Sequence, residues 1–589
     1  MAPTLILTVL GAPWIGALAV WLIGDGRPRW QHAVAAVSAL IAAGAALLLL
    51  PSAQWAATGQ AAISLPFGPF IGDLTFVPDS LAVYLTIIAT GIGSLTVIFS
   101  AGYMAGEAQL GRYYALVLAF IGAMCGLVLS GNLLFLFLFW EVTAFCSYAL
   151  ISFYNDDPRA VAAGIKALII TQLGGVGLLV GVLVASAYLP DLQVSTLLAR
   201  FGDLPAGALA VVAFGFLLAA MAKSAQFPLH IWLPDAMEAP TPVSALIHAA
   251  TMVNAGVYLL ARFYPAFAGV AGWTTAVIVV GLASVLLAGL LATTCNDLKR
   301  TLAYSTVSQL GFMVTGVGLG AIFESQFYLF SHAIFKALLF LGAGAIIHTV
   351  GTRDMRQMGA LWMRLPRVAV PFLIGAAALM GLPFFNGFWS KEILLETALE
   401  HSPLVYALLV LGAGLTAFYV VRLCWLVFFR PPETLPADHG HSAPGLAMVG
   451  PLVVLAAGAC LGWLVAEPFA RWMQATLPFH TAFLLPHWPV EEVISLHTAA
   501  SLSTAVVLGV ILLSALLWGW TTRRSGTGAT RAIARTEAFF NDSASAVAGA
   551  TRGAAGLLQA TQTGQLNWNV AGLALLAVAV LLIVVLGVI

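Results

Sequence analysis

The stretch AAMAKSAQFPLHIWLPDAMEAPTPVSALIHAATMVNAGVYLL, residues 219–260, interrupts an apolar run first with a charge and then with prolines. Lys223 ends a charge-free segment that begins at Pro205, and the next apolar segment carries His248. The prolines between them are Pro228, Pro234, Pro240 and Pro242. Because proline removes a backbone donor and ends a helix, the sequence predicts a discontinuous helix beside an ionisable side chain.

The composition indicates which solvent surrounds this segment. Hydrophobic residues make up 61% of the 589 residues and charged residues 8%, whereas a soluble domain carries about 25% charged residues. We therefore expect an all-α polytopic membrane protein, in which irregular backbone lines a cavity or is buried in protein. The formal net charge is zero, which argues against a basic surface for nucleic acid. The five scattered cysteines include no CxxC pair, which argues against an iron–sulfur or zinc site and a disulfide framework. We expect no metal and no other cofactor on this chain.

Apolar runs of about 20 residues predict about sixteen transmembrane helices. They cover residues 4–23, 33–51, 78–101, 112–130, 132–152, 162–187, 207–228, 241–262, 272–294, 299–322, 325–349, 368–395, 403–429, 446–467, 497–520 and 568–588. The first run lacks a basic n-region, so we expect a membrane span there and no cleaved signal peptide. Residues 525–565 carry a single apolar stripe at helical spacing. This pattern predicts a lateral amphipathic helix, with a partly ordered linker as the alternative.

Lysine and arginine residues are distributed unevenly between the alternate loops. Seventeen fall in one set of loops and three, Arg200, Arg262 and Arg471, in the other. Positive charge marks the cytoplasmic side, so both termini are expected outside the cytoplasm and the number of spans is expected to be even. The expected location is the cell inner (plasma) membrane, as a multi-pass protein in contact with the lipid bilayer.

Three of the five lysines lie where a lipid-embedded chain should carry no charge. Besides Lys223, they are Lys336, inside the apolar stretch 327–347, and Lys391, which ends a charge-free run that begins at Val368. A lysine at the centre of a membrane helix costs about 2.5–3.5 kcal/mol on insertion scales and usually faces a bundle interior or a wet cavity. The alternatives are an ammonium group of Lys223 that reaches the surface and an interfacial anchor at Lys391.

Histidines and one glutamate complete the candidate set. His332 and Lys336 are four residues apart, on one helix face, and predict a proton relay because imidazole titrates near neutral pH. Glu141 follows Trp140 in mid-span with no partner within one helical turn. Set against a lysine of another helix, Glu141 could exchange protons or form a fixed buried ion pair. His248 is either part of the relay or a satisfied polar residue.

A second interrupted segment, LMGLPFFNGFWSKEILLE, covers residues 379–396. It holds Pro383, Gly387, Lys391 and Glu392, and here the proline precedes the lysine. In the first segment the lysine precedes the proline. Paired interrupted helices in the two halves of a chain indicate an internal repeat with sites at its interface, and the reversed order suggests that the repeat is inverted.

Together these motifs resemble the antiporter-like subunits shared by respiratory complex I, Mrp-type Na⁺/H⁺ antiporters and membrane-bound hydrogenases. The resemblance covers nearly the whole chain and is greatest to subunit L/5 of complex I and the N-terminal part of the large Mrp subunit. It rests on Trp140-Glu141, Lys223 to Pro228, WLPDAMEAPTPVSALIHAATMV (232–253), DLKRTLAYSTVSQLG (297–311), HAIFKALLF (332–340) and GFWSKE (387–392). One departure is the pair Gly174 and Gly175, near which subunit L chains tend to place an aspartate.

The resemblance implies an organisation and a set of roles. Two inverted five-helix repeats would occupy residues 112–262 and 272–430. N-terminal transmembrane helices would occupy 1–111, C-terminal helices 446–520, a lateral helix 525–565 and an anchor span 568–589. By position, Glu141 and Lys223 would form the first-half charge pair. The central hydrophilic axis would be His248, His332 and Lys336, and the exit-side group Lys391 with Glu392.

We therefore expect a subunit that translocates H⁺ within a larger membrane complex, beside other membrane subunits. The chain offers no site for NADH, quinone or flavin. In a proton-translocating NADH:quinone oxidoreductase it would accordingly be a non-redox subunit. Two alternatives remain open. One is a Mrp-type subunit that exchanges Na⁺ for H⁺, and the other is a proton-coupled membrane partner of an inorganic-carbon uptake system.

Overall fold

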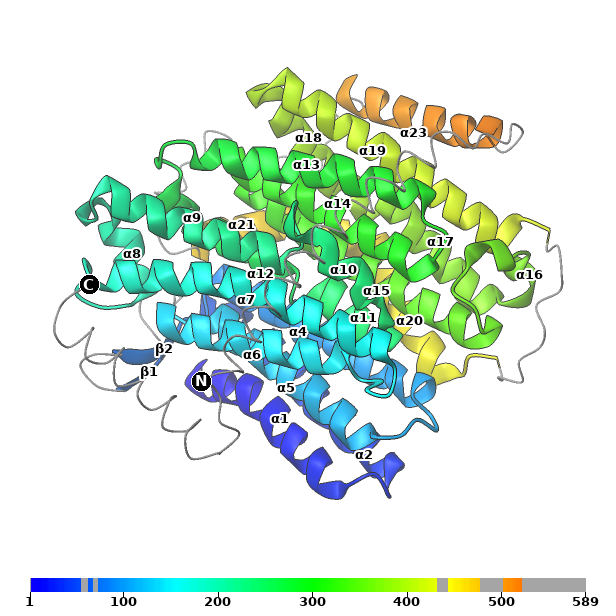
Figure 1. Ribbon diagram of the computed structural model, residues 1–589, viewed down its shortest axis with the longest axis horizontal. Helices are drawn as coiled ribbons and strands as arrows, with labels where there is room; N and C mark the ends of the chain where they lie inside the picture. Colours follow the sequence, from blue (N-terminus) through cyan, green and yellow to red (C-terminus); the bar gives the residue numbers. More distant parts are fainter. Residues whose placement is uncertain (1, 54–61, 67–71, 432–442, 477–501, 522–589) are drawn as a thin grey trace, which may run out of the picture. The chain divides into compact units, whose positions relative to one another are not determined.

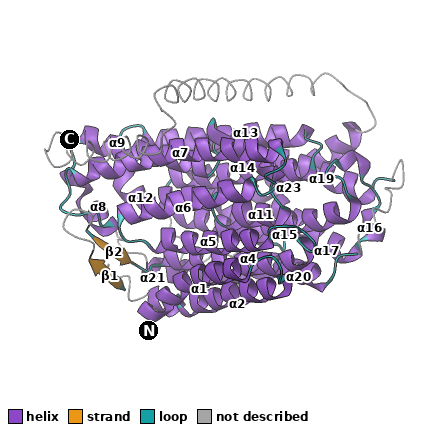
Figure 2. Cartoon of the chain, turned by 60° about the horizontal axis from the view of Figure 1, so that its bottom comes forward, coloured by secondary structure: helices purple, strands orange, loops and turns teal. Residues whose placement is uncertain are grey.

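The computed structural model describes residues 2–53, 62–66, 72–431, 443–476 and 502–521. The chain divides into two compact units, Met1–Gly526 and Thr527–Ile589, and the second lies outside the described residues. The first unit is a set of packed helices with one small hairpin (Figures 1 and 2). In the described part, twelve helices are long and apolar enough to cross a membrane. The expected all-α polytopic fold is confirmed.

The helices are named in chain order (Figure 1). The first group is α1 (Ala2–Ile23), α2 (Pro28–Leu48), α4 (Ser80–Tyr103), α5 (Leu110–Leu129), α6 (Leu133–Ile151), α7 (Pro158–Ser186), α8 (Val194–Arg200) and α9 (Ala206–Lys223). The second is α10 (Trp232–Asp235), α11 (Thr241–Ala245), α12 (Asn254–Phe267), α13 (Trp273–Thr294), α14 (Leu298–Gly318) and α15 (Ile322–Val350). The third is α16 (Leu361–Arg364), α17 (Pro366–Met380), α18 (Asn386–His401), α19 (Pro403–Cys424), α20 (Leu446–Leu461), α21 (Ala466–Thr476) and α23 (Leu502–Thr521).

The predicted count of sixteen spans is not confirmed. The predicted span 368–395 is two helices, α17 and α18, because the chain turns at Gly381, whose φ is +83°. The predicted span 299–322 is α14, a full helix that is too polar to count among the twelve. The predicted lateral helix 525–565 and the anchor span 568–588 lie outside the described residues.

Polar side chains fix where several helices begin. Asp79, Asp157 and Asp297 accept hydrogen bonds from backbone N–H groups in the first turns of α4, α7 and α14. Asn132 does the same for α6, with its Oδ1 2.9 Å from the nitrogen of Leu134. Such caps satisfy backbone donors that the helix itself leaves unpaired. They therefore set the register in which the apolar segments enter the bundle.

Small residues bring particular helix pairs into close contact. In α7 and α9, a Cβ added at Gly177 would lie 2.9 Å from the carbonyl oxygen of Gly215. In α13 and α14, a Cβ at Gly311 would lie 2.7 Å from the carbonyl oxygen of Gly281. Because lipid offers no hydrophobic driving force between helices, close backbone packing of this kind holds membrane helices together.

The loop between α2 and α4 contains a hairpin that the sequence did not predict. Strands β1 (Ile63–Pro66) and β2 (Asp73–Phe76) pair antiparallel, with Ile63 opposite Phe76. Thr75 donates a hydrogen bond to Gln193 Oε1 at 2.5 Å, and Asn132 forms an isolated bridge with Gln193. The loops before α4, α6 and α8 therefore lie on one side of the bundle.

The loops that carry most of the lysines and arginines lie together on what we call the basic side. Asp235 pairs with Lys166 at 2.7 Å and with Arg300 at 3.1 Å. Arg353 pairs with Glu238 at 3.0 Å and with Asp297 at 3.4 Å. These contacts join the N-terminal parts of α7 and α14 and the loop before α16 to the segment after α9. The grouping of loops inferred from the charge bias is therefore consistent with the structure.

Helix α15 occupies the centre of the described unit. It packs against α4, α11, α14, α17, α18 and α20 (Figure 1). It runs from the side opposite the basic side, where it begins at Ile322, to Val350, just before Arg353. Helix α15, which carries His332 and Lys336, therefore packs against elements of both interrupted segments.

Candidate functional site

The first interrupted segment begins at Lys223, the last residue of α9. Its side chain is fully buried, and its Nζ donates a hydrogen bond to the carbonyl oxygen of Trp140 in α6 at 2.7 Å. The same Nζ lies 4.8 Å from the centre of the Trp140 ring, which is a cation–π contact. Lys223 therefore does not reach the membrane surface, and the alternative interpretation of this residue is wrong.

Polar side chains satisfy the backbone groups that the interruption exposes. The helix beyond Pro240 is itself broken, since a π-helical turn, Leu246–Ala250, separates α11 from α12. Thr251 Oγ1 donates to the carbonyl of Leu246 at 2.6 Å, and Asn254 Nδ2 donates to the carbonyl of Ala249 at 3.0 Å. Irregular backbone at membrane depth persists where protein groups supply such partners.

Glu141 is half-buried and interacts electrostatically with Lys223, whose Nζ bonds the carbonyl oxygen of Trp140. Its carboxylate lies against Gly175 and beside Gln172 of α7, and a Cβ added at Gly175 would collide with its Oε1. Gly175 thus provides the space for this carboxylate. Gly174, the other unusual glycine, lets α7 approach Ala222 of α9.

His248 lies in the π-helical turn and is fully buried. Its ring centre is 5.9 Å from that of Trp232 and 6.3 Å from that of Phe340 in α15. Trp232 Nε1 donates to the carbonyl of Ala222 at 3.0 Å. One tryptophan therefore connects the residue before Lys223 with His248, and Phe340 connects His248 with α15.

Lys299 is a buried lysine, and it was not among the candidate site residues predicted from the sequence. It lies in the first turn of α14, is only 3% exposed, and donates to the carbonyl of Ala239 at 2.6 Å. Its charge acts on His248. The apolar pattern did not select Lys299, because it is adjacent to Arg300 and the pair reads as an ordinary basic loop. In the folded chain Lys299 is buried, whereas Arg300 is half-exposed.

His332 and Lys336 are both fully buried in α15, and the charge of Lys336 acts on His332. Lys336 Nζ donates to Ser305 Oγ at 2.7 Å, and Ser305 Oγ lies 2.7 Å from the Tyr419 hydroxyl. Gln309 Nε2 continues this network, 3.5 Å from the same hydroxyl. Ser305 and Gln309 belong to the quoted motif 297–311, but no pattern in the motif singles them out.

The network continues from Gln309 to Lys391. The Tyr328 hydroxyl donates to Gln309 Oε1, and Lys391 Nζ lies 5.9 Å from the centre of the Tyr328 ring. Lys391 is 2% exposed, and its Nζ donates to the carbonyl of Leu379 at 3.0 Å. It is therefore buried, which rules out the interfacial anchor. Glu392, the next residue, is also buried.

We call this set of ionisable residues the buried row. It comprises Lys223, His248, Lys299, His332, Lys336, Lys391, the buried carboxylate Glu392 and, at its edge, the half-buried carboxylate Glu141. In the described part of the chain, several of its polar atoms have no hydrogen-bond partner in the protein: Glu141 Oε1 and both ring nitrogens of His248 and of His332. Buried polar groups usually have a partner, either a protein group or an ordered water. The row is thus suited to hold water between ionisable groups.

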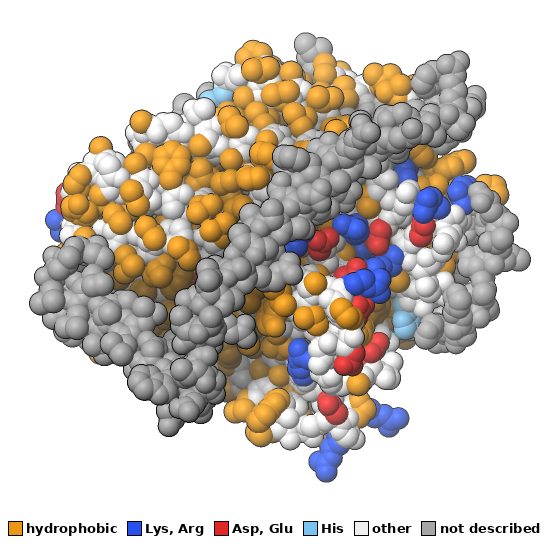
Figure 3. All heavy atoms as spheres, viewed as in Figure 1, with side chains coloured by type: hydrophobic (Ala, Val, Ile, Leu, Met, Phe, Trp, Pro, Cys, Tyr) orange, Lys and Arg blue, Asp and Glu red, His pale blue; other side chains and the backbone are white. Residues whose placement is uncertain are grey.

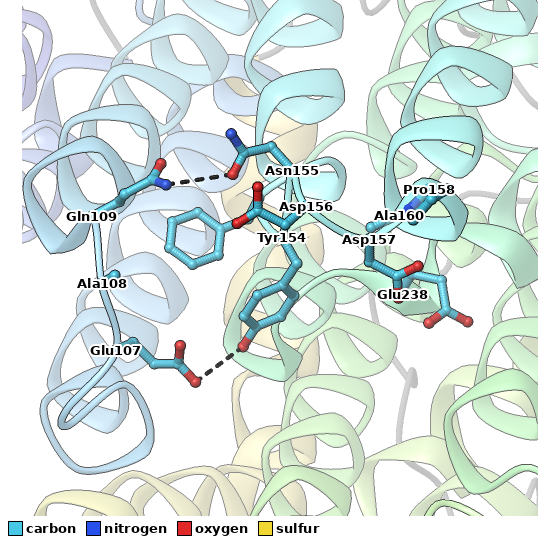
Figure 4. Close-up of a pocket in the computed structure, with 11 residues that line it drawn as sticks. Glu107, Ala108, Gln109, Tyr154, Asn155, Asp156, Asp157, Pro158, Ala160 and Glu238 are labelled. Atoms are coloured by element: carbon cyan, nitrogen blue, oxygen red, sulfur yellow. Dashed lines mark hydrogen bonds between the residues drawn. The ribbon is translucent and has the colours of Figure 1, made fainter.

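A cleft of about 730 Å³ opens on the basic side, apart from the buried row. Four carboxylates line it: Glu107, Asp156, Asp157 and Glu238 (Figure 4). The Tyr154 hydroxyl donates to Glu107 at 3.4 Å across one wall. Hydrogen bonds from Arg159 hold the pKa of the Asp157 carboxyl below its ordinary value, so this side chain keeps its charge.

Charged side chains gather in one part of the visible face, while most of the remaining described surface on that face is hydrophobic (Figure 3). A buried row of ionisable groups, carried by interrupted helices inside an apolar bundle, defines a membrane transport protein. The comparisons with known proteins specify which kind. Residues 130–416 match the family described as NADH:quinone oxidoreductase/Mrp antiporter, TM. Residues 65–114 match the NADH-Ubiquinone oxidoreductase (complex I), chain 5 N-terminus.

Two curated relatives and one solved structure agree. The chain is 37% identical over 529 residues to NAD(P)H-quinone oxidoreductase chain 5 of Synechocystis, covering 80% of this chain and 77% of the relative. It is 38% identical over 490 residues to Na⁺/H⁺ antiporter subunit A1 of Staphylococcus haemolyticus, covering 76% and 60%. A chain of the Mrp complex from Dietzia superposes with a TM-score of 0.76 at 27% identity, covering 100% and 63%. This chain belongs to the NADH:quinone oxidoreductase/Mrp antiporter family of membrane subunits.

Proposed function

We propose that this chain is the proton-translocating, antiporter-like subunit of a multisubunit membrane complex, of the subunit L/5 type. The buried row is the observation that carries the proposal. An isolated ammonium group is costly in an apolar bundle, yet Lys223, Lys336 and Lys391 are all buried there. Family membership and the names of the relatives support the same function.

The proposed path runs along α15. A proton enters from the basic side, where the acidic cleft concentrates cations. It reaches His248 near Lys299, and then His332 and Lys336. The bonded groups Ser305, Tyr419 and Gln309 lead from Lys336 toward Lys391. Because the charges of Lys336 and Lys391 act on each other, protonation of one disfavours protonation of the other. Such repulsion would move charge forward stepwise.

In this proposal, Glu141 is the residue through which a neighbouring subunit would act on the path. It is half-buried on α6, and the apolar side chains one turn away on either side, Leu138 and Phe145, are 46% and 59% exposed. A carboxylate facing lipid would be costly. A membrane subunit packed on this face would cover it and could set its charge, and through it the charge of Lys223. The names of two relatives, chain 5 and subunit A1, number them as parts of larger assemblies, which supports the presence of a neighbouring subunit.

The proposed location is the cell inner (plasma) membrane, with the basic side in the cytoplasm. Each of the proposed inverted repeats, 112–262 and 272–430, would contain one of the two interrupted segments. Glu141 with Lys223 would act in the first half, His248, His332 and Lys336 in the middle, and Lys391 with Glu392 on the exit side.

Na⁺/H⁺ exchange is the second candidate, because the Dietzia Mrp chain covers the whole of this chain in superposition. The two functions differ in whether proton flux depends on sodium. The third hypothesis, coupling to inorganic-carbon uptake, stays a prediction.

The test is purification of the chain with its native partners, followed by proton flux in proteoliposomes with and without Na⁺. Redox subunits and sodium-independent flux would support the subunit L/5 type. Small antiporter subunits and sodium-dependent flux would support the Mrp type. Lys223→Ala is expected to abolish flux while the complex still assembles. Wild-type flux in that variant would refute the role of the buried row.

A further inference from the structure

Glu324 is a buried carboxyl group that the buried row does not include. It lies in the first turn of α15 and is 3% exposed. Its end of α15 is opposite the basic side, because α15 ends at Val350 just before Arg353. A carboxyl group buried at a helix start gains some stabilisation from the helix dipole, but this does not explain its polar neighbours on α18.

Thr397 of α18 forms the direct contact with this carboxyl. Thr397 Oγ1 lies 3.5 Å from Glu324 Oε1 and 3.0 Å from the carbonyl oxygen of Ile393. The Thr397 hydroxyl has one hydrogen and cannot donate it fully to both oxygens. When Glu324 is protonated, the hydroxyl can donate to the Ile393 carbonyl and accept a hydrogen bond from the carboxylic acid. When Glu324 is ionised, the hydroxyl can donate to the carboxylate. The contact therefore accommodates both protonation states of Glu324.

Ionisable residues of α18 lead from the buried row past this contact to the surface. Lys391 and Glu392 are buried, Glu396 is half-buried, and Glu400 and His401 are exposed. Lys391 and Thr397 are six residues apart, which is about 9 Å along a helix. His401 Nδ1 lies 3.1 Å from the carbonyl oxygen of Thr397, and Glu400 acts electrostatically on Glu324.

We propose that Glu324 carries protons from the Lys391–Glu392 group to the surface opposite the basic side. The proposal rests on the proposed function and adds a residue to the proposed path between the Lys391–Glu392 group and the surface. The ammonium group of Lys391 loses a proton and becomes a neutral amine, while the Glu324 carboxylate becomes a carboxylic acid. Glu324 then releases the proton toward Glu400 and His401 and returns to the carboxylate. Protons are conserved at each step, and no electrons move.

Glu324→Gln separates this role from a structural one. The amide oxygen of glutamine still accepts a hydrogen bond from Thr397, and the side chain keeps its size, but it cannot carry a proton. Proton flux is measured in proteoliposomes that contain the whole complex, with assembly checked by size-exclusion chromatography. We expect flux to fall about tenfold or more, within the range for a lost proton-transfer group. Glu467→Gln is the matched control, because Glu467 is a half-exposed carboxylate in α21.

The outcomes separate the two proposals. Wild-type flux in Glu324→Gln beside an inactive Lys223→Ala would overturn the role of Glu324 alone. Wild-type flux in both variants would overturn both proposals. If Glu324→Gln does not assemble, Thr397→Val is the deciding variant, because it replaces only the hydroxyl that contacts Glu324 with a methyl group. Reduced flux in that variant supports the relay, and wild-type flux overturns it. Infrared difference spectra between two pH values provide a second readout, in which Glu324→Gln should lose one carboxylic C=O band and an unchanged spectrum would contradict the relay.

Discussion

Lys391 in α18 donates a hydrogen bond to the carbonyl oxygen of Leu379 in α17, 3.0 Å away, across the break between the two helices. The last carbonyls of a helix have no partner within it, and a cation placed there is stabilised by the helix dipole. The charge of Lys391 therefore also supports the geometry of the break. A change in the protonation of Lys391 would therefore change the hydrogen bond at the end of α17.

Lys391→Met should accordingly have two effects. It should abolish proton flux, and it should lower the thermal unfolding temperature of the complex, because the carbonyl of Leu379 loses its donor. Lys336→Met is the comparison, since Lys336 donates to the Ser305 side chain and not to a helix end. It should abolish flux with a smaller thermal effect. Equal thermal shifts in the two variants would show that Lys391 does not support the break.

Gly175→Ala should displace Glu141. A Cβ at Gly175 would collide with the Glu141 carboxylate, so the carboxylate must move or α7 must shift. We expect reduced flux with an assembled complex. Gly91→Ala in α4 is the control, because an added Cβ there meets no atom within 4 Å. It should be neutral or stabilising by about 0.5–1 kcal/mol, as alanine is favoured over glycine inside a helix. Normal flux in Gly175→Ala would argue against a role for the Glu141 position.

Arg262→Met should strongly destabilise the fold. The Arg262 guanidinium forms a bidentate ion pair with Asp79, and both side chains are buried on the side opposite the basic side. Removing one partner of a buried ion pair leaves an uncompensated charge and costs about 3–5 kcal/mol. The exposed pair of Arg200 with Asp203 provides the contrast. Arg200→Gln should change stability by less than about 1 kcal/mol. Thermal unfolding in detergent measures both, and a small effect in Arg262→Met would contradict the assignment.

Ser305→Ala should interrupt the network between Lys336 and Lys391. Ser305 accepts from Lys336 and lies against the Tyr419 hydroxyl, so its loss removes a connecting group at little cost in volume. We expect slower flux in Ser305→Ala and in Tyr419→Phe. The double variant should be little slower than either single variant, because groups in one network do not contribute additively. Fully additive losses would mean that the two hydroxyls act separately.

The sequence predicted those helices whose position is set by the length of an apolar run. The helices around 2–23, 80–103 and 133–151 follow their apolar runs closely, because each must satisfy its backbone hydrogen bonds internally. The hairpin β1–β2 was missed, since its four-residue strands carry almost no periodic signal. The division of the apolar run 368–395 into two helices at Gly381 was also missed, because the run reads as continuous.

The candidate site was partly predictable for a related reason. Lys223, Lys336 and Lys391 stood out because a charge inside an apolar run has a high desolvation cost whatever its neighbours. Lys299, Ser305, Gln309 and Glu324 did not stand out, since each follows polar residues or lies at a helix start. Their burial depends on which other helix covers them, and a linear pattern does not contain that information.

The sequence by itself determined that the chain enters an apolar solvent, which loops share a side, and that three ammonium groups lie in or at the end of apolar runs, where charge is costly. Each of these follows from local transfer free energies, which depend on residue type and not on partners. Only the tertiary structure decided which groups meet: Lys223 with Trp140, Lys336 with Ser305, Lys391 with the end of α17, and Glu324 with Thr397. Hydrogen bonds act over about 3 Å, so these pairings depend on how the helices pack.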